Sequence, residues 1–323
     1  MKAIVFHSYG SPDVLKCEEI EKPVPDDDHV LIKVRAASVN PLDWHGMRGK
    51  PYVGRLWGGL MRPKRPGLGV DVAGEVEAVG KNVTQFKPGD EVFGGSIGVT
   101  AFAEYACAPV SQLIPKTDKL TFEQAAAVPV AGFTALQALR DKARVQPGQK
   151  VLINGAAGGV GTFAVQLAKW LGAEVTGVCS TKNLDFVRSL GADRTIDYTQ
   201  EDFSKGVQRY DVILEAVGNR RLSAFRRALT PKGICVVVAG PNGRWLGPLS
   251  RFVEALALSP FVSQKLTPFI ANPNKEDLTA LRDLSASRKI SVVIDRCYKL
   301  ADTAEAIRYV EAGHARGKVI VVV

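Results

Sequence analysis

The chain has 323 residues, of which 46% are hydrophobic and 23% charged, as in an ordinary water-soluble globular protein. No apolar run reaches the roughly 18 residues that a membrane-spanning helix needs, and the five scattered cysteines argue against a disulfide framework. The net charge of +9 suits a phosphate-bearing ligand, but the basic residues are spread out except in Arg55–Arg65, so we expect no dedicated nucleic-acid site.

The first part of the chain predicts a β-rich domain. Residues 1–6 enter a strand-like run at once, without a leader segment, which makes the cytoplasm the expected location. Short apolar runs bounded by glycine, proline and aspartate follow, as in a bent sheet or barrel. The expected strands are Val30–Val34, Val70–Val79, Glu91–Phe93, Ala101–Ala108 and Gln112–Ile114.

The pattern changes at Thr121, which resembles a helix N-cap and is followed by helical spacing through Arg140. Strands and helices then alternate to about residue 262, which predicts a doubly wound parallel sheet, an α/β fold. The expected strands are Val151–Asn154, Glu174–Val178, Thr195–Asp197, Asp211–Glu215 and Ile234–Ala239, with helices over Thr162–Leu171, Asn183–Leu190 and Leu222–Leu229. The tail mixes helices over Lys275–Ser287 and Thr303–Ala312 with strands over Val292–Ile294 and Lys318–Val322.

The most informative segment is a glycine-rich turn between an apolar strand and a helix. Glycines let the backbone approach a pyrophosphate, and the helix N-terminus offers free N–H groups and a partial positive charge. The alternative is a purely structural turn, but a second strand completes a strand–helix–strand unit of about 30 residues. The turn consists of Gly155, Ala156, Ala157, Gly158, Gly159, Val160 and Gly161.

The residues after the second strand of this unit indicate the type of dinucleotide. NAD-binding folds place an acidic residue here, about 20 positions past the glycines, to bind the ribose hydroxyls. This chain instead has Ser180, Thr181, Lys182 and Asn183. Two hydroxyls and an ammonium can hold an additional phosphate, which favours NADP(H), although Ser180 or Thr181 can equally cap a helix.

Five motifs in order resemble the medium-chain dehydrogenase/reductase superfamily, and more narrowly its zinc-free quinone oxidoreductase branch, which includes zeta-crystallin-like proteins. The resemblance spans nearly the whole chain. It implies a GroES-like barrel domain over 1–121 and 263–323, and a Rossmann NADP(H)-binding domain over 122–262. The motifs are Asn40–Asp43, Gly69–Val76, Lys87–Val92, Ala156–Gly161 and Gly313–Lys318.

The same resemblance addresses zinc. Zinc dehydrogenases of the superfamily place a cysteine where this chain has Asn40, and a His-Glu pair where it has Val70-Asp71. Valine cannot bind zinc, asparagine is a poor ligand, and a site needs three or four convergent ligands. We therefore expect NADPH and no zinc. Without a metal to polarise an alcohol, the chemistry suits substrates that already accept hydride, namely quinones and α,β-unsaturated carbonyls.

The resemblance also assigns roles to single residues. Asn40 contacts the nicotinamide ribose or the substrate oxygen, or simply forms a turn before Pro41; Asp43 orients Asn40 or a water, or caps a helix. Tyr52 is a candidate hydrogen-bond donor to the substrate oxygen, although the family register is shifted here. The remaining expected cofactor contacts are Thr134, Tyr198, Val217, Gly218 and Lys318.

Two segments and three alternative functions stay open at this stage. The apolar, basic stretch Gly54–Gly67 either lines a pocket for a lipophilic quinone or enone or packs as a loop, and Trp245–Leu266 forms an apolar lid or a dimer surface. The resemblance to this family also implies a homodimer. The alternatives are a 2-alkenal reductase with little quinone activity, an RNA-binding or structural crystallin-like protein, and a zinc alcohol dehydrogenase.

Overall fold

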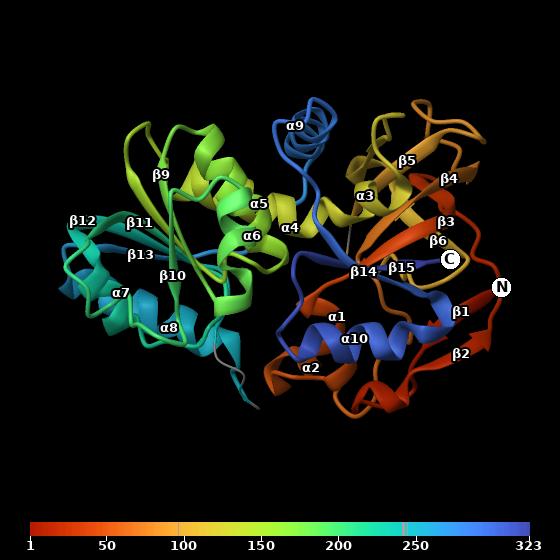
Figure 1. The fold of residues 1–323 in the computed structure, drawn as a ribbon. Coiled ribbons are helices and arrows are strands. Elements are labelled where there is room, and N and C mark those ends of the chain that lie inside the picture. The colour runs from red at the N-terminus through yellow and green to blue at the C-terminus, as the bar shows by residue number, and fades with distance from the viewer. Residues whose placement is uncertain (96, 241–242, 244) are drawn as a thin grey trace. The chain divides into compact units, whose positions relative to one another are not determined.

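The computed structural model describes residues 1–95, 97–240, 243 and 245–323, which fold into two compact units (Figure 1). Unit 1 comprises Met1–Phe133, Asn272–Arg288 and Val292–Val323. Unit 2 comprises Thr134–Ala271 and Lys289–Ser291. Both junctions lie a short way beyond the boundaries expected from the sequence, at 121/122 and 262/263.

Helix α3 explains why the first junction is displaced. It covers Phe122–Ala127 and packs against five strands of unit 1, so it belongs to that unit. Thr121 caps it as expected: its hydroxyl accepts from the amide of Gln124, whose side chain accepts from the Thr121 amide.

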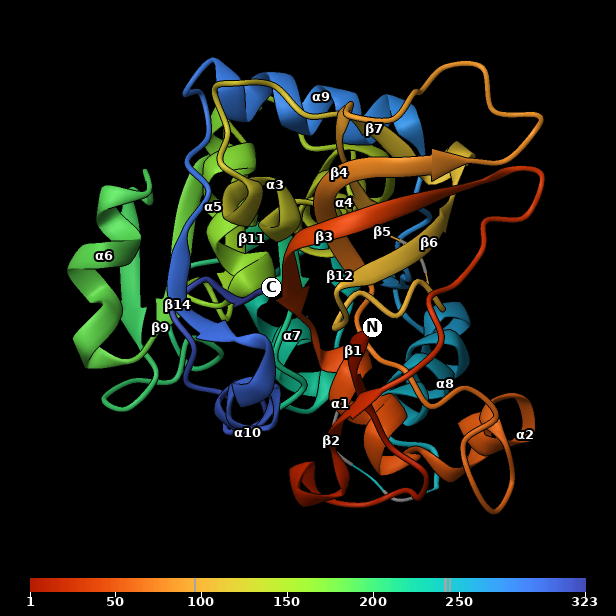
Figure 2. The same cartoon turned by 90° about the vertical axis from the view of Figure 1, so that its right-hand side faces the viewer.

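Unit 1 is built on a mainly antiparallel sheet that curls on itself (Figure 2). In the described residues the strand order is β14-β15-β3-β4-β5-β7, and β6 pairs with the first half of β3. The strands are β3 (His29–Val39), β4 (Asp71–Val79), β5 (Glu91–Gly95), β6 (Tyr105–Pro109), β7 (Leu113–Pro115), β14 (Ile294–Lys299) and β15 (Lys318–Val322), beside a hairpin of β1 (Lys2–Val5) and β2 (Lys16–Glu19).

Strand β3 shows how the sequence directs this sheet. Ile32 and Val34 are buried in the core, whereas Lys33 and Arg35 between and beyond them point to solvent. The fully buried Phe102 and Met47 fill the same core. The helices around it are α1 (Pro41–Arg48), α2 (Arg55–Gly58), α3, α9 (Lys275–Ala286) and α10 (Thr303–Glu311), while α4 (Pro129–Gln137) runs across the junction of the two units.

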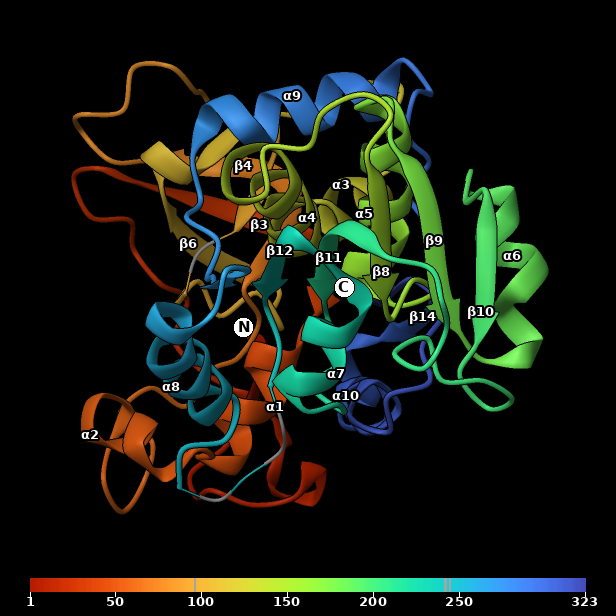
Figure 3. The ribbon, with the colours of Figure 1, turned by 90° about the vertical axis from the view of Figure 1, so that its left-hand side faces the viewer.

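Unit 2 is the predicted parallel sheet, in the order β10-β9-β8-β11-β12-β13 within the described residues. Helices α5 and α6 cover one face and α7 and α8 the other (Figures 1 and 3), as right-handed crossovers on either side of β8 and β11 require. The elements are β8 (Lys150–Asn154), α5 (Gly159–Trp170), β9 (Glu174–Cys179), α6 (Leu184–Ser189), β10 (Arg194–Asp197), β11 (Tyr210–Glu215), α7 (Leu222–Ala228), β12 (Leu229–Val237), α8 (Pro248–Leu258) and β13 (Lys265–Pro268).

Three elements differ from the sequence-based expectation. The stretch Trp245–Leu266 contains helix α8 and enters β13, which pairs in parallel with β12 as the last strand of the sheet. Strand β14 begins at Ile294, where the expected strand ends, because its pairing partner is β15. Helix α5 begins at Gly159 rather than Thr162, so Gly161 lies inside its first turn.

Substitutions at Gly161 and Gly158 test how tightly the glycine turn before α5 is packed. A Cβ at Gly161 would lie 2.0 Å from the carbonyl oxygen of Gly155, a backbone atom that cannot move aside. We expect Gly161→Ala to lower the free energy of unfolding by about 1–3 kcal/mol, as overpacking commonly does, measured by thermal and urea unfolding.

The matched variant is Gly158→Ala. Gly158 has extended backbone angles that alanine adopts, and the nearest atom to its Cβ would be the same oxygen at 3.5 Å. This variant should unfold like the wild type, and equal stability losses at the two glycines would contradict the packing that we describe.

Candidate functional site

Unit 1 contains a buried polar cluster where three strands meet. Ser38 and Asn40 stand at the end of β3, Asp71 begins β4, and Lys318 begins β15. The antiparallel register places Ser38 opposite Asp71 and Val39 opposite Val319, the neighbour of Lys318. Strand pairing alone thus brings together residues that are far apart in the sequence.

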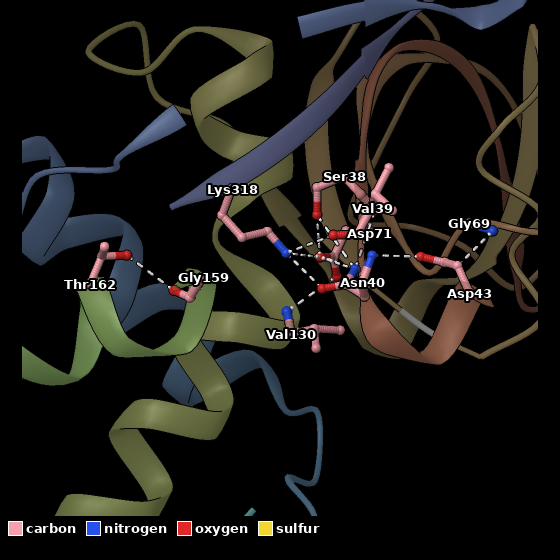
Figure 4. Close-up of polar contacts among 10 residues, drawn as sticks. All are labelled: Ser38, Val39, Asn40, Asp43, Gly69, Asp71, Val130, Gly159, Thr162 and Lys318. Carbon is pink, nitrogen blue, oxygen red and sulfur yellow. Dashed lines mark hydrogen bonds and ion pairs between the residues drawn. The ribbon is translucent and has the colours of Figure 1, made fainter. Parts of the chain in front are cut away.

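The side chains of this cluster bond to one another (Figure 4). The Asn40 amide nitrogen donates to Asp71 Oδ2 at 2.9 Å and to the Ser38 carbonyl at 3.2 Å, and the Ser38 hydroxyl donates to the same carboxylate oxygen at 2.6 Å. Lys318 Nζ donates to Asn40 Oδ1 at 2.6 Å and lies 3.7 Å from Asp71 Oδ2. The amide of Val130 donates to the other Asp71 oxygen at 3.1 Å.

Burial controls the charges of the cluster. Asp71 is fully buried and Lys318 is 4% exposed. Burial raises the pKa of Asp71, against the opposing effect of the Lys318 ammonium, and burial lowers the pKa of Lys318, against the effect of Asp71 and Asp43. Each charge is therefore tolerated mainly because the other is present, and the two form a buried ion pair held by hydrogen bonds.

Asp43 closes the N-terminus of helix α1 beside this cluster. Its carboxylate accepts from the amide of Asn40 at 2.7 Å and from the amide of Gly69 at 3.0 Å. It is 2% exposed, and burial raises its pKa to about 7. Both contacts are with backbone amides, one of them that of Asn40 itself, so in this structure Asp43 fixes the position of Asn40.

Tyr52 is placed in a short helical turn, Tyr52–Gly54, that leads into α2. The Arg55 guanidinium carbon lies 4.7 Å from the centre of its ring. The ring thus has a cationic neighbour, and the role of Tyr52 as a hydrogen-bond donor to the substrate stays a prediction.

In unit 2, the glycine turn ends at the N-terminus of α5. Gly155 has a φ of +88°, a conformation that favours glycine, and Gly158 is the N-cap. The first bond of the helical ladder runs from the Thr162 amide to the Gly158 carbonyl at 2.9 Å. The amides of residues 159–161 precede that ladder and can bind an anion such as a pyrophosphate.

A buried carboxylate holds the neighbouring turn. Glu215, at the end of β11, accepts from Asn154 Nδ2 and from the Val217 amide, both at 2.7 Å, and from the amide of Gly218. Burial raises its pKa. A Cβ at Gly155 would lie 2.6 Å from Val217, so the turn after β8 and the turn after β11 adjoin. Val217 itself is 44% exposed.

The residues expected to contact an additional phosphate follow β9. Ser180 is half-buried, Thr181 and Lys182 are exposed, and Asn183 is buried with its amide donating to the Ser180 hydroxyl at 3.2 Å. The Thr181 hydroxyl donates to Asp197 Oδ2 at 2.5 Å. Tyr198 follows Asp197 and is 45% exposed. Thr134, the other expected contact, is half-buried in α4.

The sequence did not indicate that four polar residues belong to these two sites. Ser38 and Asp71 belong to the buried cluster of unit 1, and Asp197 and Glu215 hold the turns of unit 2. Asp71 carried a signal, because a carboxylate between valines at the start of a strand requires a buried partner. Asp197 carried none, since its contact with Thr181 depends on the parallel pairing of β10 with β9.

The donor set of the unit 1 cluster does not fit zinc. The Asn40 amide is already bonded at both ends, Val70 offers no ligand atom, and a lysine ammonium lies 2.6 Å from the Asn40 oxygen. Within the described ranges, no three His, Cys, Asp or Glu side chains gather as metal ligands.

A search of the same residues for a helix long and apolar enough to cross a membrane found none.

Comparison with known proteins gives two family matches. The alcohol dehydrogenase GroES-like domain matches residues 26–118, and a family described as zinc-binding dehydrogenase matches residues 190–321. Among curated relatives, a chloroplast envelope quinone oxidoreductase homolog from Arabidopsis thaliana is 34% identical over 99% of this chain and 98% of its own length.

A second curated relative and a solved structure match the chain over nearly its full length. An NADPH-dependent alkenal/one oxidoreductase from Arabidopsis thaliana is 34% identical over 99% of this chain and 79% of its own length. The solved structure of the quinone oxidoreductase from Coxiella burnetii aligns over 100% of this chain and 99% of its own, with a TM-score of 0.90 and 34% identity. With its GroES-like unit, its Rossmann unit and these full-length relatives, the chain belongs to the quinone oxidoreductases of the medium-chain dehydrogenase/reductase superfamily.

Proposed function

We propose that this protein is an NADPH-dependent, zinc-independent reductase that transfers hydride to quinones or α,β-unsaturated carbonyls. The observation that carries the proposal is the buried Lys318 ammonium, 2.6 Å from Asn40. Asn40 is the residue at whose position the resemblance places a zinc-binding cysteine. Full-length relatives named as quinone and alkenal/one oxidoreductases support it.

The residues of unit 2 fit a dinucleotide. Gly158 leaves room for a close backbone approach, and the amides of residues 159–161 and the N-terminal end of α5 favour the pyrophosphate. Gly155, Ala156, Ala157, Val217 and Gly218 form the adjoining turns. When bound, NADPH supplies the hydride, and the protein contributes binding, orientation and the exclusion of water.

We assign the additional phosphate of NADPH to the residues after β9. The Thr181 hydroxyl is a donor to Asp197, so the groups that remain to donate to a phosphate are Ser180, Lys182 and the Tyr198 hydroxyl. Asp197 in turn accepts hydrogen bonds from Thr181 and Thr199, which lower its pKa, so it offers the phosphate no donor. We therefore place most of the phosphate's electrostatic attraction on Lys182.

In unit 1, we assign a polarising role to Lys318 together with Asn40, in place of the cofactor contact that the sequence resemblance implies for Lys318. Of the contacts of Lys318 Nζ, only that to Asn40 is short, because the Val39 carbonyl lies at 3.5 Å and Asp71 at 3.7 Å. The ammonium thus retains donor capacity for an oxygen on which negative charge develops as hydride arrives at the substrate. Asp71 and Asp43 are positioning residues.

The proposal extends to the assembly and the location of the protein. We infer a homodimer, for which the edge strand β13 and the exposed Val253 and Leu256 on α8 offer a surface, and a cytoplasmic enzyme. Light scattering of the purified protein decides the first inference.

The direct test of the activity follows the absorbance of NADPH with either 1,4-benzoquinone or a series of trans-2-alkenals as acceptor. Turnover with the quinone supports quinone reduction, and turnover confined to the alkenals assigns the enzyme to enone reduction. The absence of turnover with both acceptors would overturn the proposal.

Lys182→Gln tests the phosphate assignment. The variant loses a charged donor to the phosphate, so we expect the KM for NADPH to rise about tenfold, within the range for a hydrogen bond to a charged group. The KM for NADH, which lacks that phosphate, should stay unchanged. The control is Lys205→Gln, at another exposed lysine of unit 2, which should alter neither value. An equal loss for both cofactors would contradict the assignment.

Lys318→Met tests the polarising role. We expect kcat to fall about 10²–10³-fold, as when an oxyanion donor is removed, while the Kd for NADPH measured by fluorescence titration stays near the wild-type value. Lys318→Arg retains the charge and should recover part of kcat.

A second variant separates this effect from misfolding. Removing Lys318 alone leaves Asp71 as a buried, unpaired charge, which typically costs about 3–5 kcal/mol. Lys318→Met combined with Asp71→Asn removes both charges and should restore the thermal stability but not kcat. Recovery of kcat together with stability would show that Lys318 acts only on the fold.

A further inference from the structure

The segment around helix α2 has an unusual charge composition. From Trp44 to Val70 the chain has six lysines or arginines and no aspartate or glutamate. Arg62, Lys64 and Arg65 are all exposed, directly after α2. Arg48 is paired with Glu311 of α10, whereas the three exposed residues have no acidic neighbour within this stretch and present positive charge to solvent.

The same segment exposes large apolar side chains. Leu56 is 64% exposed, Trp57 73%, Leu60 67% and Met61 88%. Figure 2 shows α2 and the turn after it at the rim of unit 1, away from the strands of the sheet. Single exposed apolar residues are ordinary, but four within six positions form a patch that marks an interaction site. We call residues 55–65 the docking segment.

The base of the docking segment is fixed to unit 1. The guanidinium of Arg55 stacks 4.3 Å from the centre of the Tyr9 ring, and its Nε donates to the Gly49 carbonyl at 2.8 Å. The Tyr9 hydroxyl donates to the Gly59 carbonyl at 2.7 Å. The Lys64 amide closes the turn on the Gly58 carbonyl at 2.8 Å. The apolar side chains therefore project from an ordered support, and little ordering entropy opposes their burial by a partner.

We propose that the docking segment binds the surface of an anionic lipid bilayer. Trp57, Leu60 and Met61 enter the boundary between headgroups and acyl chains, and Arg62, Lys64 and Arg65 lie against the lipid phosphates. The combination of apolar and basic side chains favours a bilayer, because a nucleic acid would bind the cations and leave the leucines and the methionine in water. If the proposed function holds, this contact also brings the enzyme to the phase in which lipophilic quinones dissolve.

The test is flotation of the full-length protein with vesicles, which requires no activity and so stands apart from the proposed function. We expect binding to phosphatidylcholine vesicles that contain about 30% phosphatidylglycerol and at least tenfold weaker partition to phosphatidylcholine alone, because each basic residue near an anionic surface contributes substantially. Equal partition to both vesicles, or no binding to either, would overturn the proposal.

Two sets of substitutions identify the surface. We expect Trp57→Ser, Leu60→Ser and Met61→Ser together, and separately Arg62→Gln, Lys64→Gln and Arg65→Gln together, each to reduce partition to the anionic vesicles by tenfold or more. Retained binding of the serine variant would show simple ion exchange, and retained binding of both variants would place the contact elsewhere. Either result contradicts the proposal.

Matched controls come from unit 2. Val207 is 97% exposed and Lys205 and Arg209 lie beside it, so Val207→Ser and the pair Lys205→Gln with Arg209→Gln remove the same kinds of side chain from another surface. These variants should bind vesicles like the wild type, and a comparable loss would overturn the assignment to the docking segment. Thermal unfolding of every variant verifies the fold.

Discussion

The ion pair between Asp71 and Lys318 is the constraint on which the candidate site depends. A carboxylate with no exposed surface requires compensation, and here it comes from the ammonium at 3.7 Å, the hydroxyl of Ser38, the amide of Asn40 and the amide of Val130. Asp71 itself begins β4, and these partners come from β3 and the residue that follows it, from β15 and from the start of α4. Satisfying one buried charge therefore fixes where four elements of unit 1 meet, and it leaves Asn40 with a single orientation.

This arrangement also explains how the site differs from that of a zinc dehydrogenase. A catalytic zinc needs open ligand atoms that converge on one point, whereas the amide of Asn40 is committed to Asp71 and Lys318. The positive charge that we assign to catalysis is a side chain in place of an ion. A lysine ammonium donates hydrogen bonds but, unlike zinc, is not a Lewis acid, so this site suits acceptors that are already electrophilic, such as quinones and enones.

Much of the fold follows from local patterns in the sequence. The alternation in β3, the capping box at Thr121 and the glycine turn before α5 each have a short-range cause, and the structure has these elements close to where they are expected. What the sequence could not provide depends on pairing between distant segments. The contact of Thr181 with Asp197 requires the register of β9 and β10, and β13 is a strand because β12 offers it an edge.

The residues of the candidate site also fall into two groups, those that the sequence indicates and those whose environment depends on pairing between distant strands. The glycines and the residues after β9 were named from their order along the chain, as was Asn40. The burial of Lys318, by contrast, could not be inferred from a residue type that is usually solvated, and it arises because β15 pairs with the end of β3 beside the Asp71 carboxylate. The pairing of distant strands thus buries a lysine that the sequence alone would place in solvent, next to the buried Asp71 carboxylate.

The central claim is that this buried ammonium occupies the role of a metal. Elemental analysis of the purified protein, with turnover of NADPH and its best acceptor measured before and after exhaustive chelation, tests that claim most directly. We expect zinc far below one atom per chain and unchanged turnover after chelation. One zinc per chain, with activity that is lost on its removal and restored by its return, would contradict the claim.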